Sequence, residues 1–172
     1  APFELGVICD IFGGDRSDMG VPRLNFTLVT PQPGLVPTTL GFPVGVADGL
    51  DAASDADLVC VAPGLCENIP EPALELLRST VAKGARVMSV CSGAFVLGEA
   101  GLLDGRNCTT HWLHTDELAQ RFPSACVVPI VLYGEDGPVL ARAGAAAGLD
   151  LSLHLLRQEF GDAVAGVVAR RM

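Results

Sequence analysis

The fold is decided by the stretch Val87-Met88-Ser89-Val90-Cys91-Ser92-Gly93-Ala94-Phe95-Val96-Leu97, in which an apolar strand leads directly into a cysteine and then into a helix. A tight turn between a strand and a helix leaves room only for small side chains two positions either side of a nucleophile. Ser89 and Gly93 occupy those two positions. We therefore predict a strand-to-helix elbow that carries the thiol of Cys91.

The predicted elbow would give the Cys91 sulfur a favourable electrostatic position. The helix begins near Ser92, and its free backbone N–H groups and its dipole favour an anion at this end. A thiolate would be stabilised there. The alternative is an inert free cysteine packed at the end of a core strand, because free cysteine is among the most buried residue types. We favour the reactive site.

Composition limits the classes of protein to which the chain can belong. With 172 residues, 49% of them hydrophobic and 18% charged, we expect one compact domain over residues 1–172. No apolar run approaches the roughly 20 residues of a membrane helix, and the amino terminus lacks the features of a signal peptide. We therefore expect a cytoplasmic protein with no membrane partner. The net charge of −9 argues against direct nucleic-acid contact, which needs clustered Lys and Arg.

Hydrophobic periodicity and turn residues predict alternating helices and strands. We expect helices at residues 2–12, 71–83, 114–122 and 146–168, in addition to the elbow helix. We expect strands at 25–30, 44–47, 57–62, 107–110, 127–133 and 138–143, with a turn at 134–137 joining the last two.

This alternation indicates an α/β fold, a three-layer sandwich with a mostly parallel sheet flanked by helices. Ligands bind outside the carboxyl ends of the strands in such sheets, and Gly64 and Cys91 both follow a predicted strand. Open α/β domains usually begin with a central strand, whereas this sequence begins in a helix. We therefore expect an opening strand that was trimmed or lies outside the sequence.

Four sequence blocks resemble one known family. They are CSGAFVLGEAGLLDG (91–105), TTHW (109–112), DELAQRFP (116–123) and the final 30 residues from AGAAAGLDL onward. Together they resemble the ThiJ/PfpI superfamily, whose flavodoxin-like fold is similar to class I glutamine amidotransferases, and most of all the amino-terminal sensor domain of AraC/XylS-type transcriptional regulators. The resemblance implies a small-molecule effector, a homodimer, and DNA binding through a carboxy-terminal helix-turn-helix domain that is absent from this chain.

The resemblance also implies two catalytic positions. Cys91 matches the elbow cysteine of the superfamily, and Glu4 matches a helix carboxylate that contacts that cysteine in many members. In this sequence Glu4 shares a helix face with Ile8 and Ile11, where burial disfavours the charged form of a carboxyl group. A protonated Glu4 could donate a hydrogen bond to a Cys91 thiolate. Alternatively, Glu4 is an ordinary first-turn glutamate favoured by the helix dipole.

The other expected positions would bind the ligand. Gly64 and Leu65 match a loop whose backbone N–H groups, with that of Ser92, form an oxyanion-hole-like pocket in relatives. His111 and Gly144 complete the expected ligand-binding set. Hydrolytic relatives place a histidine directly after the cysteine as its base, whereas this chain has Ser92. His111 could substitute, but a histidine beside a tryptophan is more often a packed structural residue.

We expect neither a metal ion nor a cofactor. The six cysteines show no regular spacing and are expected to be reduced core thiols, as in the cytosol. The spacing of Cys108, His111 and His114 could suggest zinc. These three candidates span a predicted strand-to-helix junction, however, and do not converge on a tetrahedron without further ligands.

The resemblance to regulator sensor domains, the acidic charge and the absence of a histidine after Cys91 together predict a ligand-sensing regulatory domain. A sensor requires affinity without turnover, and the incomplete dyad agrees with this. One alternative is a cysteine-dependent hydratase of the isonitrile hydratase type, with Cys91 as nucleophile and Glu4 as general acid/base. Another is a redox or carbonyl-stress sensor in which Cys91 is oxidised to the sulfinic acid and held by Glu4.

Overall fold

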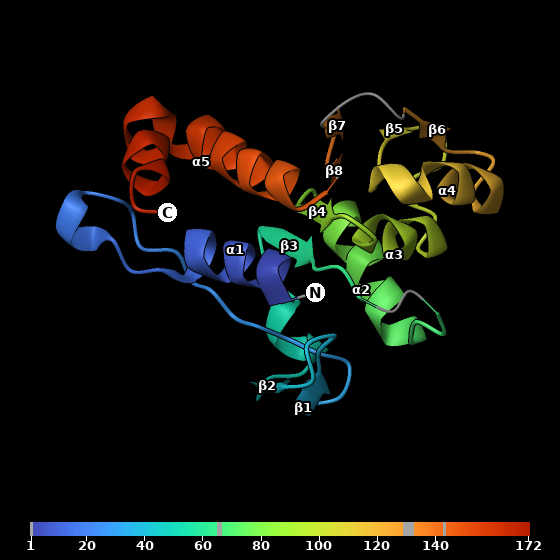
Figure 1. The fold of residues 1–172 in the computed structure, drawn as a ribbon, viewed down its shortest axis with the longest axis horizontal. Helices are drawn as coiled ribbons and strands as arrows, with labels where there is room; N and C mark the ends of the chain where they lie inside the picture. Colours follow the sequence, from blue (N-terminus) through green and yellow to red (C-terminus); the bar gives the residue numbers. More distant parts are fainter. Residues whose placement is uncertain (1, 65–66, 129–132, 143) are drawn as a thin grey trace.

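The computed structural model describes residues 2–64, 67–128, 133–142 and 144–172 (Figure 1). The α-helices are α1 (Pro2–Gly13), α2 (Glu71–Ala82), α3 (Gly93–Glu99), α4 (Thr115–Arg121) and α5 (Gly144–Ala169). The short 3-10 helices are η1 (Ser17–Met19), η2 (Leu50–Ala53) and η3 (Trp112–His114). The strands are β1 (Gly34–Pro37), β2 (Pro43–Val46), β3 (Leu58–Val61), β4 (Arg86–Val90), β5 (Asn107–Cys108), β6 (Cys126–Val127), β7 (Tyr133–Asp136) and β8 (Val139–Arg142).

The central sheet has the strand order β3-β4-β8-β7. Strands β3, β4 and β8 run parallel, and β7 pairs with β8 in the antiparallel sense. The register places Val61 opposite Ser89, and Val90 opposite Arg142. The ends of β3, β4 and β8 therefore meet at one edge of the sheet, the edge at which ligands bind in open α/β folds.

The side chains of β4 show how the layers form. Successive residues of a strand point to opposite faces of the sheet. Val87 packs in a core cluster with residues of α2 and α3, whereas Met88 and Val90 pack in a second cluster with residues of α1 and α5. One pair of helices thus covers each face of the sheet (Figure 1). The predicted three-layer α/β sandwich with a mostly parallel sheet is confirmed.

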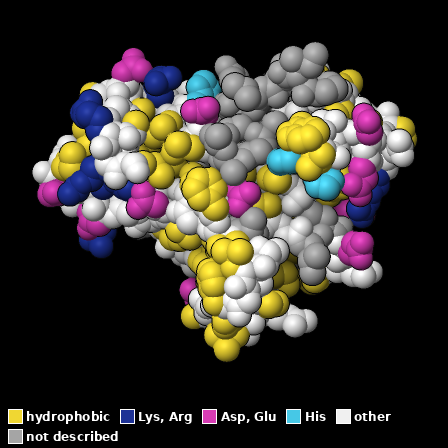
Figure 2. Space-filling model, in the orientation of Figure 1, with side chains coloured by type: hydrophobic (Ala, Val, Ile, Leu, Met, Phe, Trp, Pro, Cys, Tyr) yellow, Lys and Arg dark blue, Asp and Glu magenta, His cyan; other side chains and the backbone are white. Residues whose placement is uncertain are grey.

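A β-hairpin formed by β1 and β2 projects from the body of the molecule (Figure 1). Hydrophobic side chains gather over it (Figure 2), and among them Leu35 is 74% exposed and Leu40 is 70% exposed. The expected strand at 44–47 corresponds to β2. Strand β1 was not predicted, because Pro31, Pro33 and Pro37 give this segment the composition of a linker.

Helix α1 forms because its apolar residues recur at helical spacing, with Pro2 tolerated in the first turn. Val7, Ile8 and Ile11 are buried. At the other end, the buried Arg16 side chain donates a hydrogen bond over 2.7 Å to the Asp10 carbonyl oxygen, which also accepts from the Gly14 amide. The expectation of a helix at 2–12 is confirmed.

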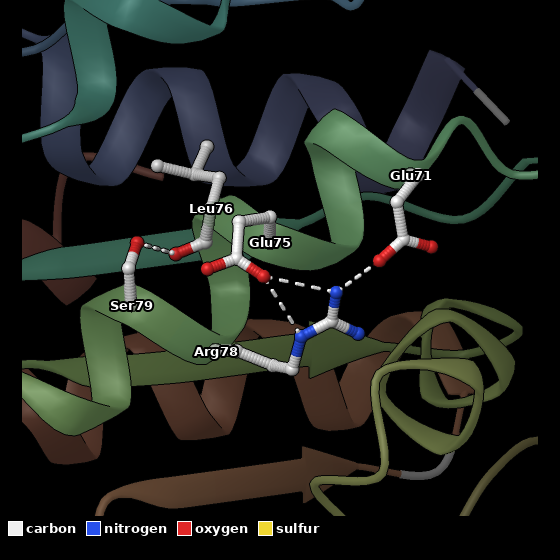
Figure 3. A network of polar contacts seen from close by, with 5 residues as sticks. All are labelled: Glu71, Glu75, Leu76, Arg78 and Ser79. Atoms are coloured by element: carbon white, nitrogen blue, oxygen red, sulfur yellow. Dashed lines mark hydrogen bonds and ion pairs between the residues drawn. The ribbon is translucent and has the colours of Figure 1, made fainter.

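Helix α2 separates an apolar face from a charged one. Leu74 and Leu77 are buried against the sheet. On the opposite side the guanidinium of Arg78 bridges the carboxylates of Glu71 and Glu75 (Figure 3). These hydrogen bonds, to Glu71 first, raise the pKa of Arg78. The charged face is solvated, and the helix expected at 71–83 is confirmed to within one residue.

One strand prediction and one turn prediction are wrong. Residues 25–30 do not form a strand; within them only Val29 forms a bridge, with Asp48, because no neighbouring described strand pairs along this segment. The residues 134–136, predicted as a turn, belong to β7, and the turn lies at Gly137 with a φ of +63°. Residues 129–132 of the strand expected at 127–133 lie outside the described residues.

The last helix follows its prediction in extent but not in its buried face. Helix α5 is broken at Gly161, which has φ +85° and ψ 170°. Of the expected face Leu156 is buried, whereas Leu149 and Leu153 are half-buried and Phe160 is exposed. The other buried leucines of the helix are Leu151 and Leu155. The helix packs on the sheet in one cluster and on α1 in another, so its buried residues do not lie on a single stripe. Across the described ranges, no helix combines the length and the apolar character needed to cross a membrane.

Substituting Gly93 tests how tightly α3 packs on the sheet. A Cβ atom at this position would lie 2.6 Å from the Val61 carbonyl oxygen. We expect Gly93→Ala to lower the free energy of unfolding by about 1–3 kcal/mol. The matched control is Gly6→Ala in α1, where a Cβ meets no described atom within 4 Å, and where alanine should stabilise by about 0.5–1 kcal/mol. Urea denaturation measures both values; equal effects would contradict the close packing.

Candidate functional site

Cys91 lies at the elbow between β4 and α3 in a strained backbone conformation. Its φ is +55°, in the left-handed region that non-glycine residues rarely adopt. Such strain persists only where the surrounding structure fixes it, and it clusters at functional sites. Cys91 is half-buried and packs against the core cluster that contains Ile8 and Val90. These observations favour the reactive cysteine over the inert one.

Small residues make the elbow possible, as the sequence predicts. Gly93 passes so close to β3 that a side chain would collide with the Val61 carbonyl oxygen. Ser89 is fully buried, and its Cβ lies 3.4 Å from the position that a Gly93 Cβ would take. Larger side chains at either place would push α3 away from the sheet.

Thr110 supports the elbow from a different segment of the chain. Its hydroxyl donates a hydrogen bond of 2.8 Å to the Cys91 carbonyl oxygen, and its side chain is fully buried. This bond fixes the peptide that follows the strained residue. We did not identify Thr110 from the sequence, although it lies within the TTHW block, because nothing local indicates a partner 19 residues away.

The loop after β3 lies next to the elbow. The Ser92 hydroxyl donates to the Gly64 carbonyl oxygen over 3.4 Å. Gly64 is exposed, and a Cβ there would meet no described atom within 4 Å, so the space beside it is open. The structure thus brings together two of the expected ligand-binding residues. Leu65 lies outside the described residues.

Gly144 lies at the same edge of the sheet, after strand β8. It is the first residue of α5 and follows Arg142, the last residue of β8, by two positions. Because Arg142 pairs with Val90, Gly144 comes directly after the strand that lies beside the elbow strand. A ligand contact by Gly144 stays a prediction.

Glu4 lies in the first turn of α1 and is half-buried. One turn later, Ile8 packs in the same apolar cluster as Val90 and Cys91. Residues four apart share one helix face, so Glu4 lies on the side of α1 that faces the sheet near the elbow. A direct contact between Glu4 and Cys91 stays a prediction.

His111 makes local contacts typical of a structural residue. Its Nδ1 accepts a hydrogen bond from the Leu113 amide over 3.3 Å, and its ring stacks on Trp112 at 5.8 Å between centroids. His114 pairs with Glu117 over 3.2 Å. The rings of the two histidines lie 6.0 Å apart between centroids, and Trp112, on which His111 stacks, is 70% exposed. A ligand contact by His111 stays a prediction.

Desolvation raises the pKa of two other thiols. It raises the pKa of Cys60 to about 12, and it raises that of Cys108 to about 11, where the nearby Cys126 adds a smaller effect. Burial also raises the pKa of Cys9. Among the described residues no three His, Cys, Asp or Glu side chains are grouped so as to hold a metal ion.

Substitutions of Thr110 and of the neighbouring Thr109 test whether the Thr110 hydrogen bond holds the elbow. Thr110→Val removes the donor to a buried carbonyl, so we expect a loss of about 1–3 kcal/mol in the free energy of unfolding and slower alkylation of Cys91. Thr109 is equally buried, but its hydroxyl has no partner among the described residues, so Thr109→Val should leave stability unchanged or raise it. The same cost for both variants would contradict a role for Thr110 in holding the elbow.

The thiol pKa values predict a pH dependence. Because the folded state raises the pKa of Cys60 and Cys108 above the ordinary value of 9.0, their contribution to stability is complete below pH 9 and is lost as the pH rises to about 12 and 11. At pH 8, peptide mapping after iodoacetamide treatment should show Cys91 and the exposed Cys126 modified before these two thiols. Faster modification of Cys60 than of Cys91 would contradict this order.

Comparison with known proteins agrees with this architecture. The model of the DJ-1/PfpI family matches residues 22–158. Isonitrile hydratase of Pseudomonas putida is 36% identical over 118 residues, which make up 65% of this chain and 49% of the relative. The HTH-type transcriptional regulator CdhR of Pseudomonas aeruginosa is 32% identical over 141 residues, 76% of this chain and 42% of the relative. The chain thus spans less than half the length of these relatives.

Solved structures show the same fold. The crystal structure of an AraC family transcriptional regulator from Pseudomonas putida has a TM-score of 0.77 and 25% identity, covering 99% of this chain and 90% of that one. A ThiJ/PfpI family protein from Pseudomonas syringae has a TM-score of 0.82 and 23% identity, covering 99% of this chain and 69% of that one. Taken with the elbow cysteine and the parallel sheet, these matches establish that the chain belongs to the DJ-1/PfpI family.

Proposed function

We propose that this chain is the ligand-sensing domain of an AraC-type transcriptional regulator and that a small-molecule effector binds beside Cys91 and Glu4. The similarity to CdhR and to the AraC family regulator of Pseudomonas putida supports a regulatory role. The net charge of −9 agrees with it, because DNA contact is then left to a separate helix-turn-helix domain. We also propose a homodimer that works in the cytoplasm.

The observation that carries the proposal is the elbow itself. Cys91 is held at a φ of +55° beside the open space at Gly64, and the residue that follows it is Ser92 rather than a histidine. Backbone donors of the elbow and of the loop after β3 could hold a carbonyl or carboxylate oxygen of an effector. A site built this way binds a ligand without a base in the adjacent position to drive turnover.

Effector binding can be tested with a metabolite library and a thermal-shift assay. We expect small carbonyl or carboxylate compounds to raise the melting temperature of residues 1–172, because a ligand that binds only the folded state stabilises it. Cys91→Ala and Glu4→Gln should remove the shift, whereas the control Cys126→Ala, at an exposed thiol of β6, should keep it. A ligand whose shift survives both site variants would place the effector elsewhere.

The full-length protein tests the regulatory part of the proposal. We expect it to retard DNA from the promoter region of its own gene in a gel-shift assay, and we expect the effector found above to change the apparent affinity. Residues 1–172 alone should not retard this DNA, because the domain is acidic. Retardation by the isolated domain, or none by the full-length protein, would contradict the proposal.

A hydratase is the second candidate, because isonitrile hydratase of Pseudomonas putida shares 36% identity over 118 residues. In that case the Cys91 sulfur would attack the isonitrile carbon, Glu4 would supply the proton, and water would release an N-substituted formamide. Turnover of an alkyl isonitrile that is lost in Cys91→Ala would favour the enzyme over the sensor.

A further inference from the structure

Helix α5 consists of two helical segments that meet at a single glycine. Gly161 has φ +85° and ψ 170°, a backbone conformation that is essentially restricted to glycine. A Cβ atom at Gly161 would meet no described atom within 4 Å, so glycine is required here by the backbone conformation and not by crowding. We call residues 144–160 the first segment of α5 and residues 162–169 the second segment.

The two segments pack on different parts of the molecule, and α5 changes direction between them (Figure 1). In the first segment, Leu151 and Leu155 share an apolar cluster with residues of β4 and β8. In the second segment, Ala165 and Val168 are buried in a separate cluster with residues of α1. The break at Gly161 therefore lies between a part of the helix that is anchored on the sheet and a part whose buried residues pack on α1.

Helix α1 contributes to both clusters and connects them to the candidate site. Ile8 packs in the cluster of the first segment, against which Cys91 also packs. Val7 and Ile11 pack in the cluster of the second segment. Glu4 lies in the first turn of the same helix. Because protein interiors are close-packed, a displacement of the first turn of α1 changes the surface on which the second segment packs.

Few buried contacts hold the second segment on α1. Only two of the residues 162–169 are buried. Two ion pairs add to them, Arg157 with Asp162 over 2.7 Å across the break and Arg171 with Asp18 over 4.0 Å. All four side chains are more than half exposed, and exposed ion pairs contribute little to stability. A segment held in this way detaches at a lower free-energy cost than the core strands do.

We propose that Gly161 is a hinge between two states, and that occupancy of the site at Cys91 and Glu4 favours the docked one. In the docked state the second segment packs on α1, as in this structure. In the extended state it continues the axis of the first segment, because glycine also accepts a helical backbone. A ligand that contacts the sheet edge and Glu4 ties the first turn of α1 to the sheet, and so holds Val7 and Ile11 in place for the second segment.

The inference rests on the proposed function and specifies how the site is coupled to the rest of the domain. A ligand shifts an equilibrium only by its different affinity for the two states. The difference arises here because α1 is packed against both clusters in the docked state, and loses the contacts of Val7 and Ile11 with the second segment in the extended state. The ligand itself therefore needs no contact with the second segment.

Hydrogen exchange in the full-length protein tests the hinge. We expect Gly161→Ala to speed exchange of the amides of residues 162–169 by about tenfold or more, because alanine disfavours the backbone conformation of the docked state. The matched control is Gly166→Ala within the second segment, where a Cβ would lie 3.6 Å from the Arg170 guanidinium, an ordinary contact. There alanine favours the helix in both states and should leave exchange unchanged or slower. Equal exchange in the two variants would overturn the hinge.

Labelling of the thiol tests the coupling in the same protein. Iodoacetamide at about pH 8 places a carboxamide on Cys91 below the ordinary thiol pKa, and intact mass with peptide mapping confirms the attachment. We expect exchange at residues 162–169 to slow by about fivefold or more, the lower limit of ordinary coupling between sites, while the β1–β2 hairpin stays unchanged. Cys91→Ala treated in the same way controls for the other thiols and should show no change.

The outcomes separate the coupling from the proposed function. A labelled Cys91 with unchanged or faster exchange at residues 162–169 would overturn the coupling and leave the proposed function standing. Slower exchange in the treated Cys91→Ala variant would assign the effect to another thiol and would overturn the coupling as well. A Cys91 that iodoacetamide does not reach in the folded protein would contradict the candidate site, and the proposed function would fail with it.

Discussion

The structure depends on the close approach of α3 to β3 at Gly93. A glycine there lets the helix start within contact of the Val61 carbonyl oxygen, and the chain must then turn so sharply that Cys91 takes a φ of +55°. The Thr110 hydroxyl fixes the resulting peptide through its bond to the Cys91 carbonyl oxygen. The strain is maintained by packing and by a buried hydrogen bond, so the thiol projects from a rigid part of the fold and not from a loop.

The elbow and the layers could be predicted because their causes are local. Ser89 and Gly93 satisfy a steric requirement that is visible in five residues, and the apolar run of β3 indicates a covered parallel strand. The role of Thr110 could not be predicted, nor could the fully buried hydroxyl of Thr109, which has no partner in the described part of the chain, because both follow from contacts with distant segments. The prediction of a strand at 25–30 is wrong for a related reason, since strand formation depends on a neighbouring strand and not on composition alone.

Cys91 differs in its surroundings from Cys60 and Cys108. Desolvation raises the pKa of Cys60 and of Cys108, so both thiols remain neutral over the physiological range. Cys91 differs in position, at the sheet edge where the loop after β3 and the start of α5 converge. The chain is similar in sequence both to a transcriptional regulator and to an isonitrile hydratase, so the fold alone does not decide the function and the groups around that sulfur do.

We propose that the Cys91 sulfur opens into a pocket shared with Glu4. Paramagnetic relaxation in the NMR spectrum tests it most directly, with a nitroxide attached to Cys91 in a Cys126→Ser background. We predict that the label attaches to the folded protein, broadens the Glu4 amide resonance and leaves the β1–β2 hairpin sharp. A thiol that cannot be labelled without unfolding, or a Glu4 resonance that stays as sharp as that of the hairpin, would contradict the claim.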